Sequence, residues 1–190
     1  MIDFLIISQR HNKNGTEFYP KFRLYPKSSD LMIRGGDFYA VWIEELGVWS
    51  TNEQDALRII DRELDKAAAE YEKRNGIKPK IFHMWDSESG MIDAWHRYCQ
   101  KQLRDSYNML DETLIFSNTE TTKKDYSSKR LSYPLEQGDI SAWDKLVSTL
   151  YSEEERRKIE WAIGAIVSGD SKEIQKFMVL YGEAGAGKST

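Results

Sequence analysis

The chain has 190 residues with a formal net charge of −4, so it is not uniformly basic, and any contact with DNA must come from a local patch. Hydrophobic residues make up 40% and charged residues 31%, a balance typical of globular domains. No apolar run reaches the roughly 20 residues of a membrane helix, so no membrane partner is expected. The single cysteine, Cys99, excludes an internal disulfide and a cysteine-rich zinc site, which indicates a reducing, cytoplasmic setting.

Residues 1–50 predict a small antiparallel sheet. Apolar runs of strand length occupy residues 2–8 and 16–26, and residues 37–51 predict two aromatic strands joined by a tight turn near Leu46–Gly47. Between the first two runs, residues 8–15 predict a loop. Three side chains in this loop could contact DNA phosphates, with a plain surface loop as the alternative: Arg10, His11 and Lys13.

Two helices are predicted next. Asn52 precedes apolar residues at steps of three and four, and Asn75–Gly76 form a stop. The apolar residues of this first helix are Leu57, Ile60, Leu64, Ala67 or Ala68, and Tyr71. Residues 77–85 are extended because Pro79 disfavours helix, and a second helix is predicted from Glu88 to about Tyr107. Together these elements predict an α+β domain over residues 1–112.

The aromatic residues of the predicted strands allow two interpretations. Strand alternation places Phe38 and Trp42 on one face and Tyr39 and Val41 on the other. The set could form a platform on which bases of a single strand stack, but aromatic residues in strands usually pack in a core. The candidate platform residues are Phe38, Tyr39, Trp42 and Trp49.

A metal site is a weaker interpretation of four residues near the second helix. His96 and Cys99 have helical i, i+3 spacing, but one cysteine and no regularly spaced fourth partner favour packing and surface roles. The four residues are His83, Asp86, His96 and Cys99.

Residues 113–138 predict a short strand, Thr113–Ser117, followed by a polar linker. Basic side chains in the linker are interleaved with Tyr126 and Tyr133, which suits phosphate contacts and base stacking. A solvated linker without a ligand is the alternative. The candidate DNA contacts are Lys123, Lys124, Lys129 and Arg130.

Residues 139–174 predict a helical module. Asp139–Ser141 can cap a first helix, and Ser152 with Glu155 has the spacing of a capping box that opens a second. The second helix has Ile159, Ile163 and Ile166 on one face with Trp161 beside them, and it is expected to end at Gly169–Asp170. A short helical turn and an apolar strand, Phe177–Tyr181, are predicted to follow.

The last residues fit the pattern of a phosphate-binding loop: glycine, four residues, glycine, lysine, and serine or threonine. Glycines let backbone N–H groups approach phosphate oxygens, Lys188 places a positive charge on the β- and γ-phosphates, and Ser189 supplies a hydroxyl to Mg²⁺. A preceding apolar strand is the context that this motif requires. The predicted nucleotide-binding residues are Gly182, Glu183, Ala184, Gly185, Ala186, Gly187, Lys188, Ser189 and Thr190.

Residues 153–170 and 174–190 together resemble the entry to the ATPase domain of superfamily 3 helicases. More closely, they are similar to the phage and plasmid primase–helicases related to the poxvirus primase–helicase, which carry a helical module just before the ATPase core. Residues 112–139 are similar to the run that leads into this module in phage proteins. The fold that this implies is an α+β domain, a helical module and, over residues 175–190, the first strand and loop of a phosphate-loop ATPase domain.

The resemblance implies a hexameric, ATP-driven translocase that unwinds DNA at a replication fork. The protein would be phage-encoded and act in the cytoplasm of a bacterial host, with ATP and Mg²⁺ as cofactors and DNA as partner. Many relatives carry a primase, whose metal site needs closely spaced aspartates. The sequence contains no Asp-x-Asp pair, so residues 1–112 are predicted to be an accessory or DNA-binding domain.

On this interpretation the chain is the N-terminal part of a longer helicase and would not hydrolyse ATP alone. Hydrolysis also requires an acidic Mg²⁺-binding strand and an arginine from a neighbouring subunit, both expected beyond Thr190. The alternative is a non-catalytic DNA-binding or oligomerisation module of a phage replication protein. A packaging motor or a partitioning ATPase is a third reading, which the helical module disfavours.

Overall fold

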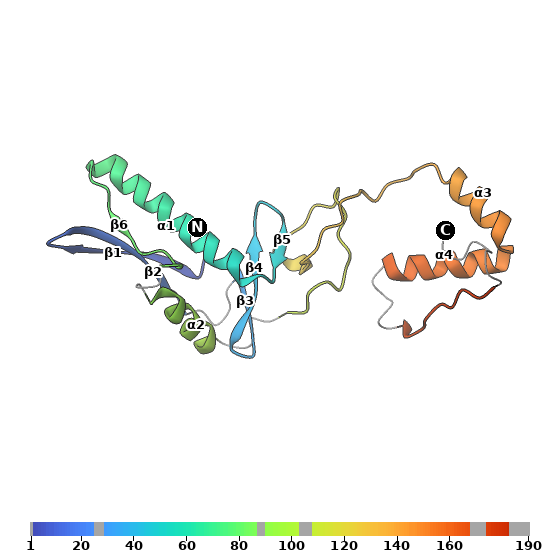
Figure 1. Ribbon diagram of the computed structural model, residues 1–190, viewed down its shortest axis with the longest axis horizontal. Coiled ribbons are helices and arrows are strands. Elements are labelled where there is room, and N and C mark those ends of the chain that lie inside the picture. Colours follow the sequence, from blue (N-terminus) through green and yellow to red (C-terminus); the bar gives the residue numbers. More distant parts are fainter. Residues whose placement is uncertain (1, 25–28, 87–89, 103–107, 168–173, 183–190) are drawn as a thin grey trace. The chain divides into compact units, whose positions relative to one another are not determined.

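A computed structural model describes residues 2–24, 29–86, 90–102, 108–167 and 174–182 (Figure 1). The chain divides into two compact units: Met1–Leu110 with Thr121–Ser128, and Asp111–Glu120 with Lys129–Thr190. Within the described residues, the first unit contains two small sheets and two α-helices, and the second contains two α-helices. The predicted α+β class is therefore confirmed, while the domain boundaries predicted from the sequence stay a prediction.

The first sheet is built on a hairpin. Strands β1 (Leu5–Asn12) and β2 (Gly15–Phe22) pair antiparallel along their full length, and the short β6 (Lys80–Ile81) lies parallel to β2. The loop predicted for residues 8–15 is wrong, because Arg10 and His11 lie in β1 and only Lys13 and Asn14 form the turn. The ladder extends this far because each residue of β1 finds a backbone partner in β2.

The second sheet contains β3 (Leu31–Arg34), β4 (Asp37–Ile43) and β5 (Val48–Ser50), all antiparallel. The predicted turn near Leu46–Gly47 is confirmed: the Gly47 N–H donates to the Ile43 carbonyl at 2.9 Å, and Gly47 has φ 60°. That positive φ is costly for residues with a Cβ, which explains the glycine.

Helix α1 (Glu53–Asn75) begins and ends where the sequence predicts. The Asn52 side chain accepts a hydrogen bond from the Gln54 N–H, and Gly76 adopts the left-handed conformation at φ 67°. Acidic residues lie in its first turn and Lys73 and Arg74 in its last, which complements the helix dipole. The helix packs along both sheets of the first unit and buries six residues: Ala56, Leu57, Ile59, Ile60, Leu64 and Ala68.

Helix α2 (Met91–Lys101) is shorter than the predicted range of Glu88 to Tyr107. Gly90 precedes it in the left-handed conformation at φ 64°, and Gln102 after it is extended at ψ 143°. Both conformations interrupt the helical hydrogen-bond ladder, so they set the limits of the helix. Residues 87–89 and 103–107 lie outside the described part of the chain.

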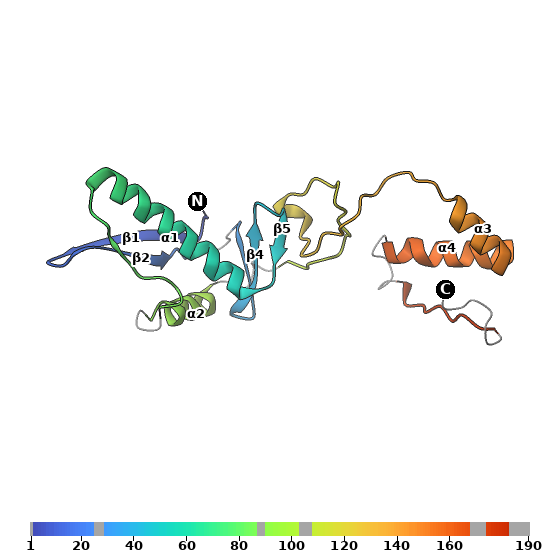
Figure 2. The ribbon, with the colours of Figure 1, turned by 45° about the horizontal axis from the view of Figure 1, so that its top comes forward.

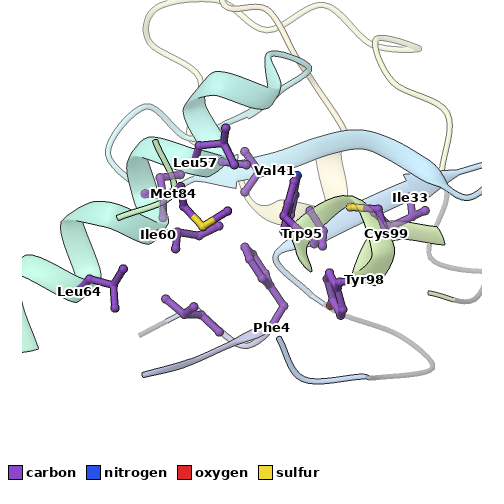
Figure 3. Close-up of a cluster of buried hydrophobic side chains, with 14 residues drawn as sticks. Phe4, Ile33, Val41, Leu57, Ile60, Leu64, Met84, Trp95, Tyr98 and Cys99 are labelled. Atoms are coloured by element: carbon purple, nitrogen blue, oxygen red, sulfur yellow. The ribbon is translucent and has the colours of Figure 1, made fainter. Parts of the chain in front are cut away.

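The core of the first unit lies between α1, α2 and the strands (Figure 3). Trp95 is fully buried at its centre, with ring centroids 5.8 Å from Phe4 and 5.3 Å from Phe22. Leu57, Ile60 and Leu64 contribute to this cluster from α1 (Figure 3). This cluster explains why both helices are held against the sheets.

The second unit contains α3 (Ser141–Leu150) and α4 (Glu153–Val167). The predicted capping box at the start of α4 is confirmed, because the Glu155 carboxylate accepts from the Ser152 N–H at 2.8 Å. Before α3 the Asp139 carboxylate accepts from the Ser141 N–H at 2.9 Å, but the N-cap residue is Ile140, which makes no side-chain cap hydrogen bond. Ile159 is half-buried, but Ile163 and Ile166 are exposed. Residues 168–173, where the sequence predicts the helix end and part of the next turn, lie outside the described residues.

The predicted strand Thr113–Ser117 is wrong. The structure has an isolated parallel bridge between Ile115 and Arg130. The chain turns soon after it, since the Thr119 N–H donates to the Phe116 carbonyl at 3.1 Å. Among the helices that the structure describes, none has the length and apolar character needed to span a bilayer.

Candidate functional site

Residues 121–128, which carry two of the four candidate DNA contacts, Lys123 and Lys124, fold onto the second sheet of the first unit. Its short 3₁₀ helix η2 (Lys123–Asp125) is held by a capping box, in which the Asp125 carboxylate accepts from the Thr122 N–H at 2.6 Å. Hydrogen bonds from the Thr122 backbone and side chain lower the pKa of Asp125. The Thr-x-x-Asp spacing was visible in the sequence and could have predicted this local order.

Hydrogen bonds along β5 hold this segment against the sheet. The Trp49 indole N–H donates to the Lys123 carbonyl at 2.9 Å, and the Trp49 backbone N–H donates to the Ser127 carbonyl at 2.8 Å. The Thr121 hydroxyl donates to the Gly47 carbonyl at 2.6 Å, and the Tyr126 ring stacks 6.2 Å from Trp49. Residues 121–128 are therefore a packed part of the first unit and not a solvated linker.

The aromatic residues of this sheet do not form an open stacking platform. Trp42 and Trp49 are buried, with exposed fractions of 6% and 2%, and their rings meet at 5.7 Å. Phe38 packs instead toward Trp95 in the main core, at 6.2 Å. Core packing, the alternative considered for these residues, accounts for Phe38, Trp42 and Trp49.

The predicted assignment of faces on β4 is wrong. Phe38 lies on the side of the main core with Val41, while Trp42 belongs to the cluster on the opposite side. The ladder pairs Met32 with Ala40 and Ile33 with Phe38, so Tyr39 is an extra residue in β4. Such a β-bulge inverts the alternation of side chains beyond it.

The four candidate DNA contacts are divided between the two units. Lys123 forms an ion pair with Asp30, whose side chain is only 10% exposed. Arg130 donates from its guanidinium to the carbonyls of Phe116 at 3.1 Å and Thr119 at 2.7 Å. Lys123 and Arg130 therefore hold local structure, whereas Lys124 and Lys129 are exposed at the surface.

A polar hollow adjoins Lys123. Its charged lining is drawn from α1, from the turn after β4 and from Asp30, and its volume is about 280 Å³. Arg62 meets Glu45 at 2.8 Å, Lys66 meets Glu63 at 2.8 Å, and the Trp42 indole N–H donates to Glu44 at 2.6 Å. A main-chain hydrogen bond to the Glu45 carboxylate lowers its pKa, burial opposes this shift, and the Arg62 charge adds to the lowering. Because these charges neutralise one another, the hollow is not a focused site for an anion.

The two histidines among the candidate metal ligands lie beside carboxylates outside that set. His83 Nε2 lies 2.7 Å from Asp65 Oδ1, and His96 Nε2 lies 3.4 Å from Glu53 Oε1. Cys99 is buried in the main core, where desolvation and the nearby charges of Glu53 and Asp37 raise its pKa to about 12. Across the described residues, no group of three or more His, Cys, Asp or Glu side chains is arranged to hold a metal ion.

The predicted phosphate loop falls almost entirely outside the described residues, which include Gly182 but not residues 183–190. Phe177–Tyr181 precede it without a strand assignment and are exposed, up to 99% at Tyr181. A strand of a parallel ATPase sheet would need neighbouring strands as ladder partners, so the predicted strand stays a prediction.

No protein-family model, no curated protein and no solved structure matches this chain.

Proposed function

We propose that the protein is an ATP-dependent DNA helicase of the phage type, acting in the cytoplasm of a bacterial host. The observation that carries the proposal is the spacing of glycines, lysine and serine from Gly182 to Ser189. A chance match is disfavoured because two helices, α3 and α4, precede this pattern, as the helicase resemblance implies. In this proposal Lys188 binds the β- and γ-phosphates of ATP and Ser189 holds Mg²⁺.

The test is ATP hydrolysis by the gene product at its natural length, with and without single-stranded DNA. The Lys188→Ala variant should lose at least about a hundredfold in hydrolysis, because the lysine stabilises charge on the transferred phosphoryl group. Lys145→Ala, an exposed lysine of α3 outside the motif, is the matched control and should keep activity. Equal hydrolysis by wild type and Lys188→Ala, or no nucleotide binding by wild type, would overturn the proposal.

A second candidate function, oligomerisation, is favoured by the apolar surface of the second unit. Trp161, Ile163 and Ile166 of α4 are 54%, 43% and 63% exposed. An apolar groove runs between Trp161 and Ile166 of α4 on one side and Phe177 and Met178 on the other. Contiguous apolar surface of this kind is typical of a protein–protein contact. We propose that it joins copies of the chain, as a hexamer would require.

Light scattering tests this second candidate. Ile166→Glu should convert an oligomer to monomer, since a carboxylate in an apolar contact is strongly disfavoured. Lys145→Glu, an exposed position on α3 outside the groove, is the control and should leave the mass unchanged. A wild-type protein that is monomeric at all concentrations would refute the oligomer.

A further inference from the structure

The outer face of the β1–β2–β6 sheet is an open surface that the proposed function does not use. Residues directly opposite in a ladder share a face, so the pairing of Leu5 with Phe22 and of His11 with Thr16 defines the inner face. The Thr16 hydroxyl is hydrogen-bonded to Tyr71 of α1 at 2.8 Å, and Phe18 packs on the same ring at 5.5 Å. Helix α1 therefore covers the inner face (Figures 1 and 2).

The alternate residues of the three strands point to the other side. They are Ile6, Ser8, Arg10 and Asn12 of β1, Glu17, Tyr19 and Lys21 of β2, Lys80 of β6, and Phe82 just after it. The Phe82 N–H donates to the Phe18 carbonyl at 2.9 Å, so the ladder continues through Phe82. Among the described residues, none of these nine side chains is buried or belongs to a hydrophobic core cluster.

The ladder arranges this outer face in rows. One row runs across the sheet through Ser8, Tyr19 and Phe82, and places two aromatic rings on neighbouring strands. The next row contains Arg10, Glu17 and Lys80. Lys21 lies on the far side of the aromatic row, with its ammonium group 5.5 Å from the Tyr19 ring centroid, and the Lys80 ammonium lies 4.5 Å from the Phe82 ring.

This arrangement has the chemistry of a single-strand binding surface. Aromatic rings accept bases by stacking without regard to sequence, and flanking cations meet the phosphates. The outer face carries three cationic side chains, Arg10, Lys21 and Lys80, and one carboxylate, Glu17. This surface therefore has an excess of positive charge in a chain whose net charge is −4. This excess of positive charge favours a polyanion as the partner over an apolar surface.

We propose that the outer face of the β1–β2–β6 sheet binds single-stranded DNA, with bases stacked on Tyr19 and Phe82 and phosphates held by Arg10, Lys21 and Lys80. The proposal is independent of the phosphate loop, since the binding needs no nucleotide. This surface replaces the aromatic platform predicted from the sequence, because Trp42 and Trp49 are buried. It also replaces the basic run as the phosphate-binding site, because Lys123 pairs with Asp30 and Arg130 binds backbone carbonyls.

The test is fluorescence anisotropy of a labelled oligothymidylate titrated with the full chain, without ATP. Tyr19→Ala and Phe82→Ala should each weaken binding roughly tenfold, as expected for the loss of one base stack. Trp85→Ala, an aromatic residue of the first unit that is 51% exposed and lies outside the three strands, is the matched control and should bind as wild type does.

The salt dependence tests the cations separately from the rings, in a variant that leaves the aromatic row intact. Three phosphate contacts predict a slope of about −2 for log affinity against log salt, and Lys80→Gln should reduce its magnitude by about 0.7. Absent binding at low salt, equal affinity for duplex DNA, or unchanged affinity in both aromatic variants would overturn the proposal. Lys188→Ala should bind the oligonucleotide normally, so failure of this surface and failure of the ATPase proposal are distinguishable.

Discussion

The helices of the two units have similar sequence signals and different surroundings. α1 and α4 both begin at a side-chain cap and both carry ion pairs on their surfaces. α1 buries six residues and α2 buries three, whereas α3 buries only Val147 and α4 none, within the described residues. Caps and apolar spacing therefore predict where a helix forms, but not whether its apolar face is covered.

The surface ion pairs of α4 do not replace a core. Arg157 pairs with Glu153 and Lys158 with Glu154, each at 2.7 Å, and all four side chains are at least 68% exposed. Exposed i, i+4 pairs contribute little to stability because solvent screens their charges. The first unit should consequently unfold as a cooperative domain, while α3 and α4 should depend on whatever covers their apolar faces.

The largest contrast is expected between two tryptophans. Trp95→Ala should destabilise the first unit by about 3–5 kcal/mol, because it empties the centre of the core. Trp161→Ala, on the exposed face of α4, should change stability by less than about 0.5 kcal/mol in the monomer. Urea denaturation followed by circular dichroism measures both, and comparable losses in the two variants would contradict the contrast.

A smaller effect is expected where residues 121–128 join the first unit. The Asp30 carboxylate accepts from the Lys123 ammonium and, at 2.8 Å, from the Asp3 N–H. Asp30→Ala should cost about 1–3 kcal/mol, because it leaves both donors without their acceptor. Lys124→Ala, the neighbouring exposed lysine, serves as control in the same urea titration. If Asp30→Ala matched the control, residues 121–128 would not be anchored to the unit.

The smallest effect concerns pH and Asp61, which accepts from the Met84 N–H at 2.7 Å. Desolvation raises the pKa of Asp61 despite this hydrogen bond. A raised pKa in the folded state means that the contribution of Asp61 is greatest below its ordinary pKa and is lost as pH rises through the folded value. Asp61→Asn keeps an acceptor but does not titrate.

The melting temperature of Asp61→Asn minus that of wild type should therefore be larger at pH 7 than at acid pH. Thermal melts at pH 3 and pH 7 check this. A difference between variant and wild type that is the same at both values, or larger at pH 3, would show that burial of this carboxylate does not oppose its ionisation.

Sequence reasoning predicted the features that depend on neighbouring residues. Asn52, Gly76 and the Ser152–Glu155 pair act within a few positions, so α1 and the start of α4 were predictable. The bulge at Tyr39 was not, because one extra residue in a ladder depends on the facing strand.

The candidate surfaces were also not predictable from the sequence, because they depend on contacts between distant residues. The bond between Trp49 and the Lys123 carbonyl joins residues 74 positions apart, and no local pattern indicates it. The row of Tyr19 and Phe82 exists only because β6 returns parallel to β2 after α1. The phosphate loop, in contrast, is recognisable from the sequence because its chemistry is confined to consecutive residues.

Amide hydrogen exchange on the whole chain tests the division between the two units most directly. The account predicts strong protection for α1, for the strands β1 to β5 and for the Trp49 and Gly76 amides, with residues 121–128 protected alongside them. The amides of α3 and α4 should exchange at least about a hundredfold faster in the monomer, since few buried contacts oppose their opening. Equal protection in α3, α4 and α1, or exchange of residues 121–128 at the rate of an unstructured linker, would contradict it.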